Sequence, residues 1–212
     1  MSPSKEKTPE VERKVLGLLQ KFSKEESGSV SVELLFVVPI LFWTLMSTFV
    51  FFDAYRAEAI STRAGLTIAD MYSRETDPIT PAYLNGTRQL LRSLTEAEAD
   101  PDFRVTAYQY FETDDEYRVI WSRNRGMTPN YNDARFANIR NRVPDLSDGE
   151  VAILVETRTQ YTAPFTSAIA PFDVDSLREI EFNTFVFISP RPIQVCWQQT
   201  STSDQLCDRF SG

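Results

Sequence analysis

The stretch Gly28-Ser-Val-Ser-Val-Glu33-Leu-Leu-Phe-Val-Val-Pro39-Ile-Leu-Phe-Trp-Thr-Leu-Met-Ser-Thr-Phe-Val-Phe-Phe52 decides how the rest of the chain is organised. From Leu34 to Phe52 no side chain is ionisable. In a helix these 19 residues span about 28 Å, close to the hydrocarbon thickness of a bilayer. We therefore expect a membrane span at about 34–52, with Glu33 at its edge and Pro39 as a kink inside it.

A carboxylate in this position needs a partner, because at the bilayer centre it costs about 2–3 kcal/mol, although less near the interface. The spacing resembles the type IV prepilin signature, in which a cationic leader ends in Gly and Glu is the fifth residue of the mature chain. The resemblance implies cleavage between Gly28 and Ser29 and pairing of Glu33 with the N-terminal ammonium of a neighbouring subunit. An uncleaved signal-anchor helix with Glu33 among the lipid headgroups is the alternative that the spacing leaves open.

The flanks of the span predict its orientation. Six basic residues precede it: Lys5, Lys7, Arg13, Lys14, Lys21 and Lys24. The nearest basic residues after it are Arg56 and Arg63. This bias predicts a single-pass protein with a cytoplasmic N-terminus and an extracytoplasmic C-terminal part. Ala57-Glu-Ala59 has the small-x-small form of a secretory cleavage site, but the apolar run is longer than that of a cleavable signal, so we expect the span to be retained.

Composition excludes several classes of function. A net charge of −8 argues against nucleic acid as a partner. The 212 residues include no histidine, which removes the commonest general base and metal ligand. Catalysis by carboxylates or Lys in an envelope enzyme is the alternative that composition leaves open, but we expect neither enzymatic activity nor a cofactor. Cys196 and Cys207, the only two cysteines, are spaced as a local disulfide in an oxidising compartment. A redox-active pair is the alternative, although it is more typical of Cys-x-x-Cys spacing.

Beyond Asp53 the helical pattern continues, and it predicts one helix from about Val30 to Tyr72, within a helical region at 29–75. Its second half should present small and apolar residues to a soluble head at 76–212. These residues are Ala57, Ile60, Ala64, Ile68 and Met71, with Gly65 among them. Thr80-Pro81 has the composition of a helix start, a capping hydroxyl followed by Pro. The buried side of that second helix is expected to carry Leu84, Leu90, Leu91 and Leu94.

The remainder of the chain is typical of strands. Phe103–Phe111 alternates in polarity, with Phe103, Val105 and Ala107 on one face, and it is expected to form a hairpin with 117–121 across an acidic turn at 112–116. Further strands are predicted at 150–162 and 179–188, with a short helix at 132–142. The predicted fold is α+β: a long N-terminal helix packed on an antiparallel sheet, as in pilins.

The acidic turns at 112–116 and 145–150 offer oxygen ligands for Ca²⁺. Neither has the spacing of a calcium-binding loop, so we expect solvated turns and no metal site.

Three stretches resemble the TadE/TadF-like minor pilins, or pseudopilins, of the tight-adherence (Flp) pilus system. They are Gly28 to Pro39, Val143-Pro-Asp-Leu-Ser-Asp-Gly-Glu-Val-Ala-Ile-Leu-Val-Glu156 with Tyr161 and Pro164, and Phe187-Ile-Ser-Pro-Arg191. The resemblance implies a subunit of the bacterial inner membrane whose head lies in the periplasm and which takes part in assembling an adhesive pilus. Its partners would be a prepilin peptidase that removes the leader 1–28, other pilins and assembly proteins, and the bilayer. Leu34 follows Glu33, whereas major Flp pilins favour an aromatic residue there, which points to a minor pilin.

Overall fold

The computed structural model describes residues 27–163, 179–191, 195–198 and 205–206. The chain forms two compact units, Met1–Phe49 and Val50–Gly212, and each is described by itself. Helix α2 (Ser27–Arg74) contributes to both units as one uninterrupted helix that contains Pro39. The predicted long helix at 30–72 is therefore confirmed, and it begins three residues earlier and ends two residues later than the sequence indicates.

The second unit is built on a four-stranded antiparallel sheet in the order β2-β1-β3-β4. The strands are β1 (Asp102–Phe111), β2 (Glu116–Arg125), β3 (Val151–Thr162) and β4 (Glu179–Ile188). A short pair, β5 (Trp197–Gln198) and β6 (Gln205–Leu206), forms a second sheet. The α+β class and the predicted strands are confirmed.

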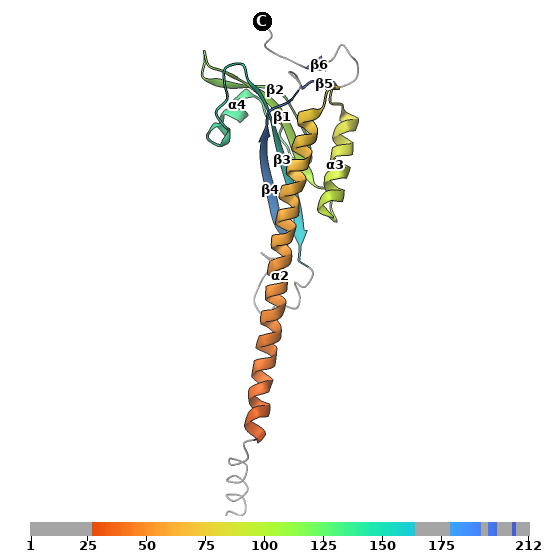
Figure 1. The fold of residues 1–212 in the computed structure, drawn as a ribbon, viewed down its shortest axis with the longest axis vertical. Coiled ribbons are helices and arrows are strands. Elements are labelled where there is room, and N and C mark those ends of the chain that lie inside the picture. Colours follow the sequence, from red (N-terminus) through yellow and green to blue (C-terminus); the bar gives the residue numbers. More distant parts are fainter. Residues whose placement is uncertain (1–26, 164–178, 192–194, 199–204, 207–212) are drawn as a thin grey trace, which may run out of the picture. The chain divides into compact units, whose positions relative to one another are not determined.

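One face of this sheet is covered by the second half of α2 and by helix α3 (Pro81–Thr95), which lie beside each other in Figure 1. Thr80 caps α3 by accepting a hydrogen bond from the Tyr83 backbone N–H, with Pro at the start of the helix as the sequence predicts. The core between these layers joins the two helices to three strands. It includes Ala64, Ile68, Ala69, Tyr72, Leu84, Leu91, Phe103, Val105, Ala107, Trp121, Ile153 and Val155.

The expected buried side of α3 is wrong in part. Leu84 and Leu91 are fully buried, but Leu90 and Leu94 are exposed. The buried positions of α3 are Leu84, Thr87 and Leu91, so the inward face of the helix includes Thr87 and excludes Leu90 and Leu94. Thr87 takes an inward position because its hydroxyl lies 3.0 Å from the Tyr72 hydroxyl of α2. Thr87 is polar, but its hydrogen bond allows it to occupy a buried position where a hydrophobic residue would be expected.

Strand β2 is longer than expected, since it continues past Trp121 to Arg125. Two arginines at the polar C-terminal end of β2 contact neighbouring elements and hold this end in place. The Arg123 guanidinium lies over the Trp197 ring, and Arg125 donates to the Asn85 side chain and to the Pro81 carbonyl of α3. A β-bulge where the register shifts at Ala107/Tyr108 makes Ile120 an extra residue, and it joins its neighbour Trp121 in the same core cluster.

The opposite face of the sheet is covered by the connection between β2 and β3, which contains α4 (Asp133–Ala137) and the 3-10 turn η1 (Arg140–Arg142). Phe136 of α4 is fully buried against Tyr108, with ring centroids 4.6 Å apart. The short helix expected at 132–142 is thus present as two pieces. Tyr108, Tyr117, Val119, Val143, Ala152 and Leu154 complete this second core cluster.

Gly65 fixes how closely α2 approaches β4. A Cβ at this position would lie 3.1 Å from the Thr184 Cγ2 atom, whereas a Cβ at Gly86 on α3 would meet nothing within 4 Å. Gly65→Leu is expected to reduce the free energy of unfolding by about 1–3 kcal/mol through overpacking. The matched variant Gly86→Leu should stabilise slightly, by less than about 1 kcal/mol, because leucine favours a helix over glycine. Denaturant unfolding in detergent, followed by tryptophan fluorescence, measures both, and equal effects would contradict the close contact.

Candidate functional site

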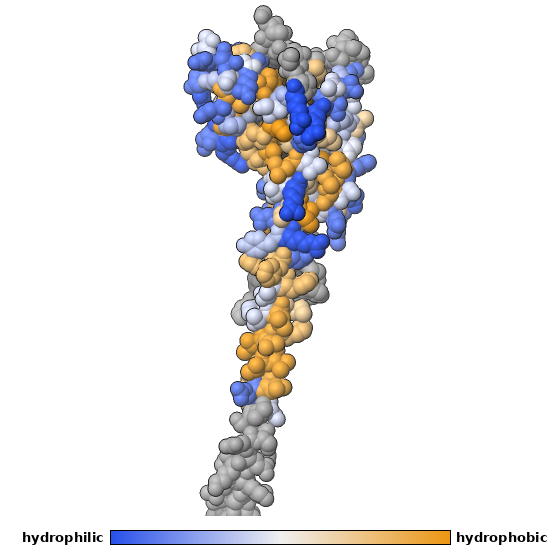
Figure 2. Space-filling model, in the orientation of Figure 1, coloured by the Kyte–Doolittle hydropathy of each residue, from blue (hydrophilic) through white to orange (hydrophobic). Residues whose placement is uncertain are grey.

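The described residues include one helix that is long and apolar enough to cross a membrane, and it is α2. Its apolar side chains in the first unit are exposed rather than packed: Leu35 is 68% and Phe36 65% exposed. Figure 2 shows an almost continuous hydrophobic surface over this part of the helix. An apolar surface of this extent is stable in lipid or against other apolar helices, and not in water.

The residues predicted for processing and pairing lie at the start of this helix. The backbone of Gly28 and Ser29 is already helical, Glu33 is exposed one helical turn after Ser29, and Pro39 lies further along. In a helix, residues four apart lie about 6 Å apart along the axis. If the chain were cut after Gly28, the amine released at Ser29 and the Glu33 carboxylate would therefore lie close together at the same end of the helix. Residues 1–26 of the predicted leader 1–28 lie outside the described residues.

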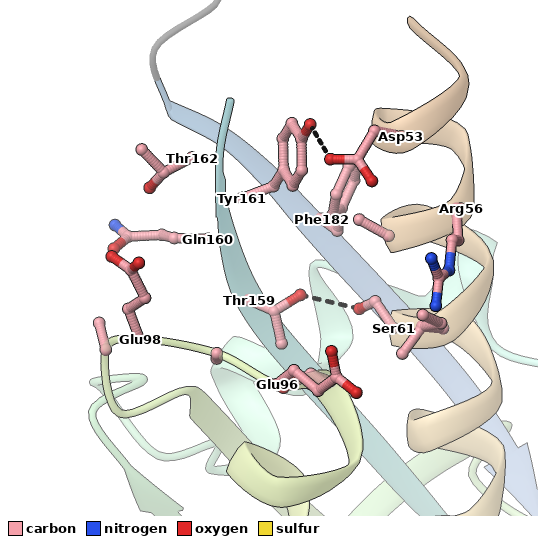
Figure 3. Close-up of a pocket in the computed structure, with 15 residues that line it drawn as sticks. Asp53, Arg56, Ser61, Glu96, Glu98, Thr159, Gln160, Tyr161, Thr162 and Phe182 are labelled. Atoms are coloured by element: carbon pink, nitrogen blue, oxygen red, sulfur yellow. Dashed lines mark hydrogen bonds between the residues drawn. The ribbon is translucent and has the colours of Figure 1, made fainter. Parts of the chain in front are cut away.

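Where the apolar run ends, α2 enters the second unit and borders a hollow of about 400 Å³ (Figure 3). The other walls are the loop after α3, the end of β3, and Phe182 of β4. Two hydrogen bonds join α2 to β3 across this region. The Tyr161 hydroxyl donates to the Asp53 carboxylate at 2.7 Å, and the hydroxyls of Ser61 and Thr159 are 2.8 Å apart and buried.

The hollow contains charges of both signs. Arg56 comes from α2, whereas Glu96 and Glu98 come from the loop after α3. Figure 3 shows Arg56 and Ser61 on α2 facing Glu96 from across the hollow. Within the part of the chain that the structure describes, none of these three charged side chains makes an ion pair or a side-chain hydrogen bond. The hollow therefore offers unused charge to a ligand.

A buried ion pair lies elsewhere in the second unit, on the sheet face that carries α4. Arg104 of β1 donates through Nε and Nη2 to both oxygens of Glu156 on β3, at 2.7 and 2.8 Å, and through Nη1 to the Pro129 carbonyl. The Tyr131 hydroxyl donates to the same carboxylate at 3.2 Å, and the Arg104 guanidinium lies 3.8 Å from the centre of the Tyr131 ring. Because both side chains are buried and make several hydrogen bonds within the head, we interpret this pair as a structural one.

The tyrosines at both places are hydrogen-bond donors. Burial raises the pKa of Tyr161, and its hydrogen bond to Asp53 raises it further. Burial likewise raises the pKa of Tyr131, with the nearby Glu156 carboxylate adding to the effect. Both hydroxyls therefore stay protonated at physiological pH and position carboxylates. The chemistry offered here is hydrogen bonding and charge recognition.

The acidic turns take partners within the chain. Asp115 forms an ion pair with Arg140, whose hydrogen bond lowers the pKa of the carboxyl group, and Asp114 pairs with Arg118. Asp148 accepts a hydrogen bond from the Glu112 backbone N–H. Among the described residues no group of three or more His, Cys, Asp or Glu side chains is placed to hold a metal ion.

Cys196 is disulfide-bonded. The other cysteine of the predicted disulfide, Cys207, lies outside the described residues, so the expected pairing stays a prediction.

Sequence reasoning missed the hollow. Asp53 and Arg56 carry a local signal, since they are the first charged residues after the apolar run, but Glu96 and Glu98 lie some forty residues later in a loop. Only the packing of α3 against α2 brings them to the same place.

No family model, no curated protein and no solved structure matches this chain.

Proposed function

We propose that this chain is a minor pilin-like subunit, similar to the TadE/TadF-like pseudopilins, that takes part in assembling a tight-adherence (Flp-type) pilus and so supports surface adhesion. The observation that carries the proposal is helix α2. It bears Glu33 at the edge of an exposed apolar surface and continues without interruption into a half that packs on an antiparallel sheet. Its role is assembly, with no chemistry required of the head.

The physical reason is that each part of α2 needs a different neighbour. The apolar surface of 34–52 is satisfied by lipid before assembly and by other apolar helices within a filament. Glu33 is then left with a carboxylate in an apolar setting, and the amine released at Ser29 of an adjacent subunit is the cation that satisfies it. A continuous helix allows one subunit to reach both environments.

The proposed location follows from the same features. The subunit spans the bacterial inner membrane once, with its N-terminus in the cytoplasm and its head in the periplasm. The bias in basic residues supports this orientation. The disulfide at Cys196 supports an oxidising compartment for the head. The proposed partners are a prepilin peptidase, other pilins and assembly proteins of the membrane, and the bilayer.

Intact mass tests the proposal directly. Produced in a cell that carries a prepilin peptidase of the tight-adherence system, the membrane-extracted protein should have the mass of a chain that starts at Ser29. Gly28→Trp should remain uncut, because a bulky side chain at the cleaved bond blocks the peptidase. The matched variant Gly17→Trp, inside the leader but away from the bond, should be cut like the unchanged protein.

Two results would overturn this proposal. An uncut unchanged protein would identify a simple membrane-anchored scaffold or binding protein of the envelope. Normal cutting of Gly28→Trp would place the processed bond elsewhere in the chain.

A further inference from the structure

The hollow beside α2 begins where the apolar run ends. Asp53 is the residue that follows Phe52, and Arg56 is four residues beyond the span. At a rise of 1.5 Å per residue, Arg56 lies about 6 Å along the helix axis from the last apolar residue. The headgroup layer on each side of a bilayer is about 5–8 Å thick, taking roughly 40–45 Å for the whole membrane and 30 Å for its hydrocarbon core. With 34–52 in the membrane, this wall of the hollow is at headgroup depth.

The charges in the hollow match a headgroup that carries both signs. Arg56 supplies a guanidinium, which binds phosphate oxygens through several N–H donors. Glu96, which faces Arg56 across the hollow in Figure 3, supplies a carboxylate that accepts hydrogen bonds from an ammonium, whereas Glu98 lies beside Gln160, away from Arg56. Asp53 is already engaged by the Tyr161 hydroxyl, which leaves Arg56 as the cation and Glu96 as the anion available to a ligand.

We propose that this hollow binds the headgroup of a membrane phospholipid that carries a primary ammonium, with Arg56 on the phosphate and Glu96 on the ammonium. The inference rests on the membrane insertion of α2 that is part of the proposed function. A lipid with only a negative headgroup has no ammonium to offer Glu96, and its charge is repelled by that carboxylate. A choline headgroup has no N–H to donate, so it loses the hydrogen bond to Glu96.

The backbone of Glu96 supplies a way to separate binding from folding. Glu96 ends α3 in the left-handed region, with φ 51°, and its backbone N–H bonds to the Arg92 carbonyl. Glycine or asparagine is the usual residue at such a helix end, because other side chains are strained there. Glu96→Gly therefore removes the carboxylate while keeping or improving the stability of the fold, so that a loss of lipid binding in this variant cannot be attributed to unfolding.

Native mass spectrometry tests the site with the whole chain. The protein is extracted in detergent and offered equimolar phosphatidylethanolamine, phosphatidylcholine and phosphatidylglycerol. We expect one phosphatidylethanolamine to be retained about tenfold more than either competitor, and Arg56→Gln and Glu96→Gly to reduce it to the level of the competitors. Arg63→Gln is the matched control, since Arg63 is an exposed arginine two turns further along α2, and it should behave like the unchanged protein.

A second arm distinguishes the lipid from its free headgroup. Soluble phosphoethanolamine at millimolar concentration should displace little of the bound lipid, because the acyl chains alongside 34–52 add to the affinity. Complete displacement would show a site for a free phosphoester. Equal retention of the three lipids, or an equal loss in Arg63→Gln, would overturn the proposal even where cutting after Gly28 is normal. Failure of the chain to fractionate with membranes would instead overturn the membrane placement itself.

Discussion

Glu156→Ala is expected to lower the free energy of unfolding of the head by about 3–5 kcal/mol, because it leaves the Arg104 guanidinium buried without its counter-charge. The side chains of Arg104 and Glu156 are only 9% and 10% exposed, so the guanidinium would have little contact with water to offset the lost carboxylate. The substitution also removes the hydrogen-bond acceptor of the Tyr131 hydroxyl, which donates to Glu156 in the unchanged protein.

Removing both charges together should be far milder. Arg104→Met combined with Glu156→Leu substitutes apolar side chains for the whole pair, a change that is often neutral or stabilising in other proteins. Glu181→Ala is the matched control on the neighbouring strand, where an exposed carboxylate lies 3.9 Å from Arg158, and it should change stability by less than about 1 kcal/mol. Denaturant unfolding measures all three. A Glu156→Ala effect no larger than that of Glu181→Ala would show that the pair is solvated.

The second large effect concerns assembly. Glu33→Ala should leave cutting after Gly28 intact but reduce incorporation into pili at least tenfold. The neighbouring ammonium at Ser29 would lose its counter-charge in an apolar setting, where an unpaired charge costs about 2–3 kcal/mol, and each 1.4 kcal/mol is a factor of ten. Glu33→Gln should behave similarly, since it keeps the shape of the side chain and removes the charge.

The measurement is the ratio of subunit in sheared pili to subunit in membranes, by immunoblot. Glu58→Ala is the matched control, because Glu58 is an exposed carboxylate on the same helix beyond the apolar run. It should be incorporated normally. Wild-type incorporation of Glu33→Ala would remove the pairing role from the proposal while leaving the processing experiment unaffected.

Much of the fold could be predicted because its signals are local. The helical period predicts α2 from the apolar run into the head, alternation predicts β1, and Thr80-Pro81 predicts the start of α3. Each of these depends on neighbours within a few residues in the sequence, so a single sequence contains it.

The errors arise where distant contacts override local preference. Leu90 and Leu94 are exposed since the rotation of α3 is set partly by the hydrogen bond between Thr87 and Tyr72. The polar end of β2 remains in the sheet because Arg123 packs over the Trp197 ring and Arg125 donates a hydrogen bond to the Asn85 side chain. The hollow was not predicted for the same reason: Glu96 and Arg56 line the same hollow only because the two helices pack together, and no spacing in the sequence indicates this.

The contacts between α2 and β3 also have a consequence for the order of events during synthesis. Ser61 and Asp53 meet partners 98 and 108 residues later in the chain. At roughly 5–20 residues per second, a ribosome needs about 5–20 s to make the strand that covers them. Under the proposed membrane placement, the apolar half of α2 can lie in the bilayer during that interval while its inward face in the head is still uncovered. A periplasmic chaperone, or an already folded neighbouring subunit, is then expected to cover that face until the strand is made.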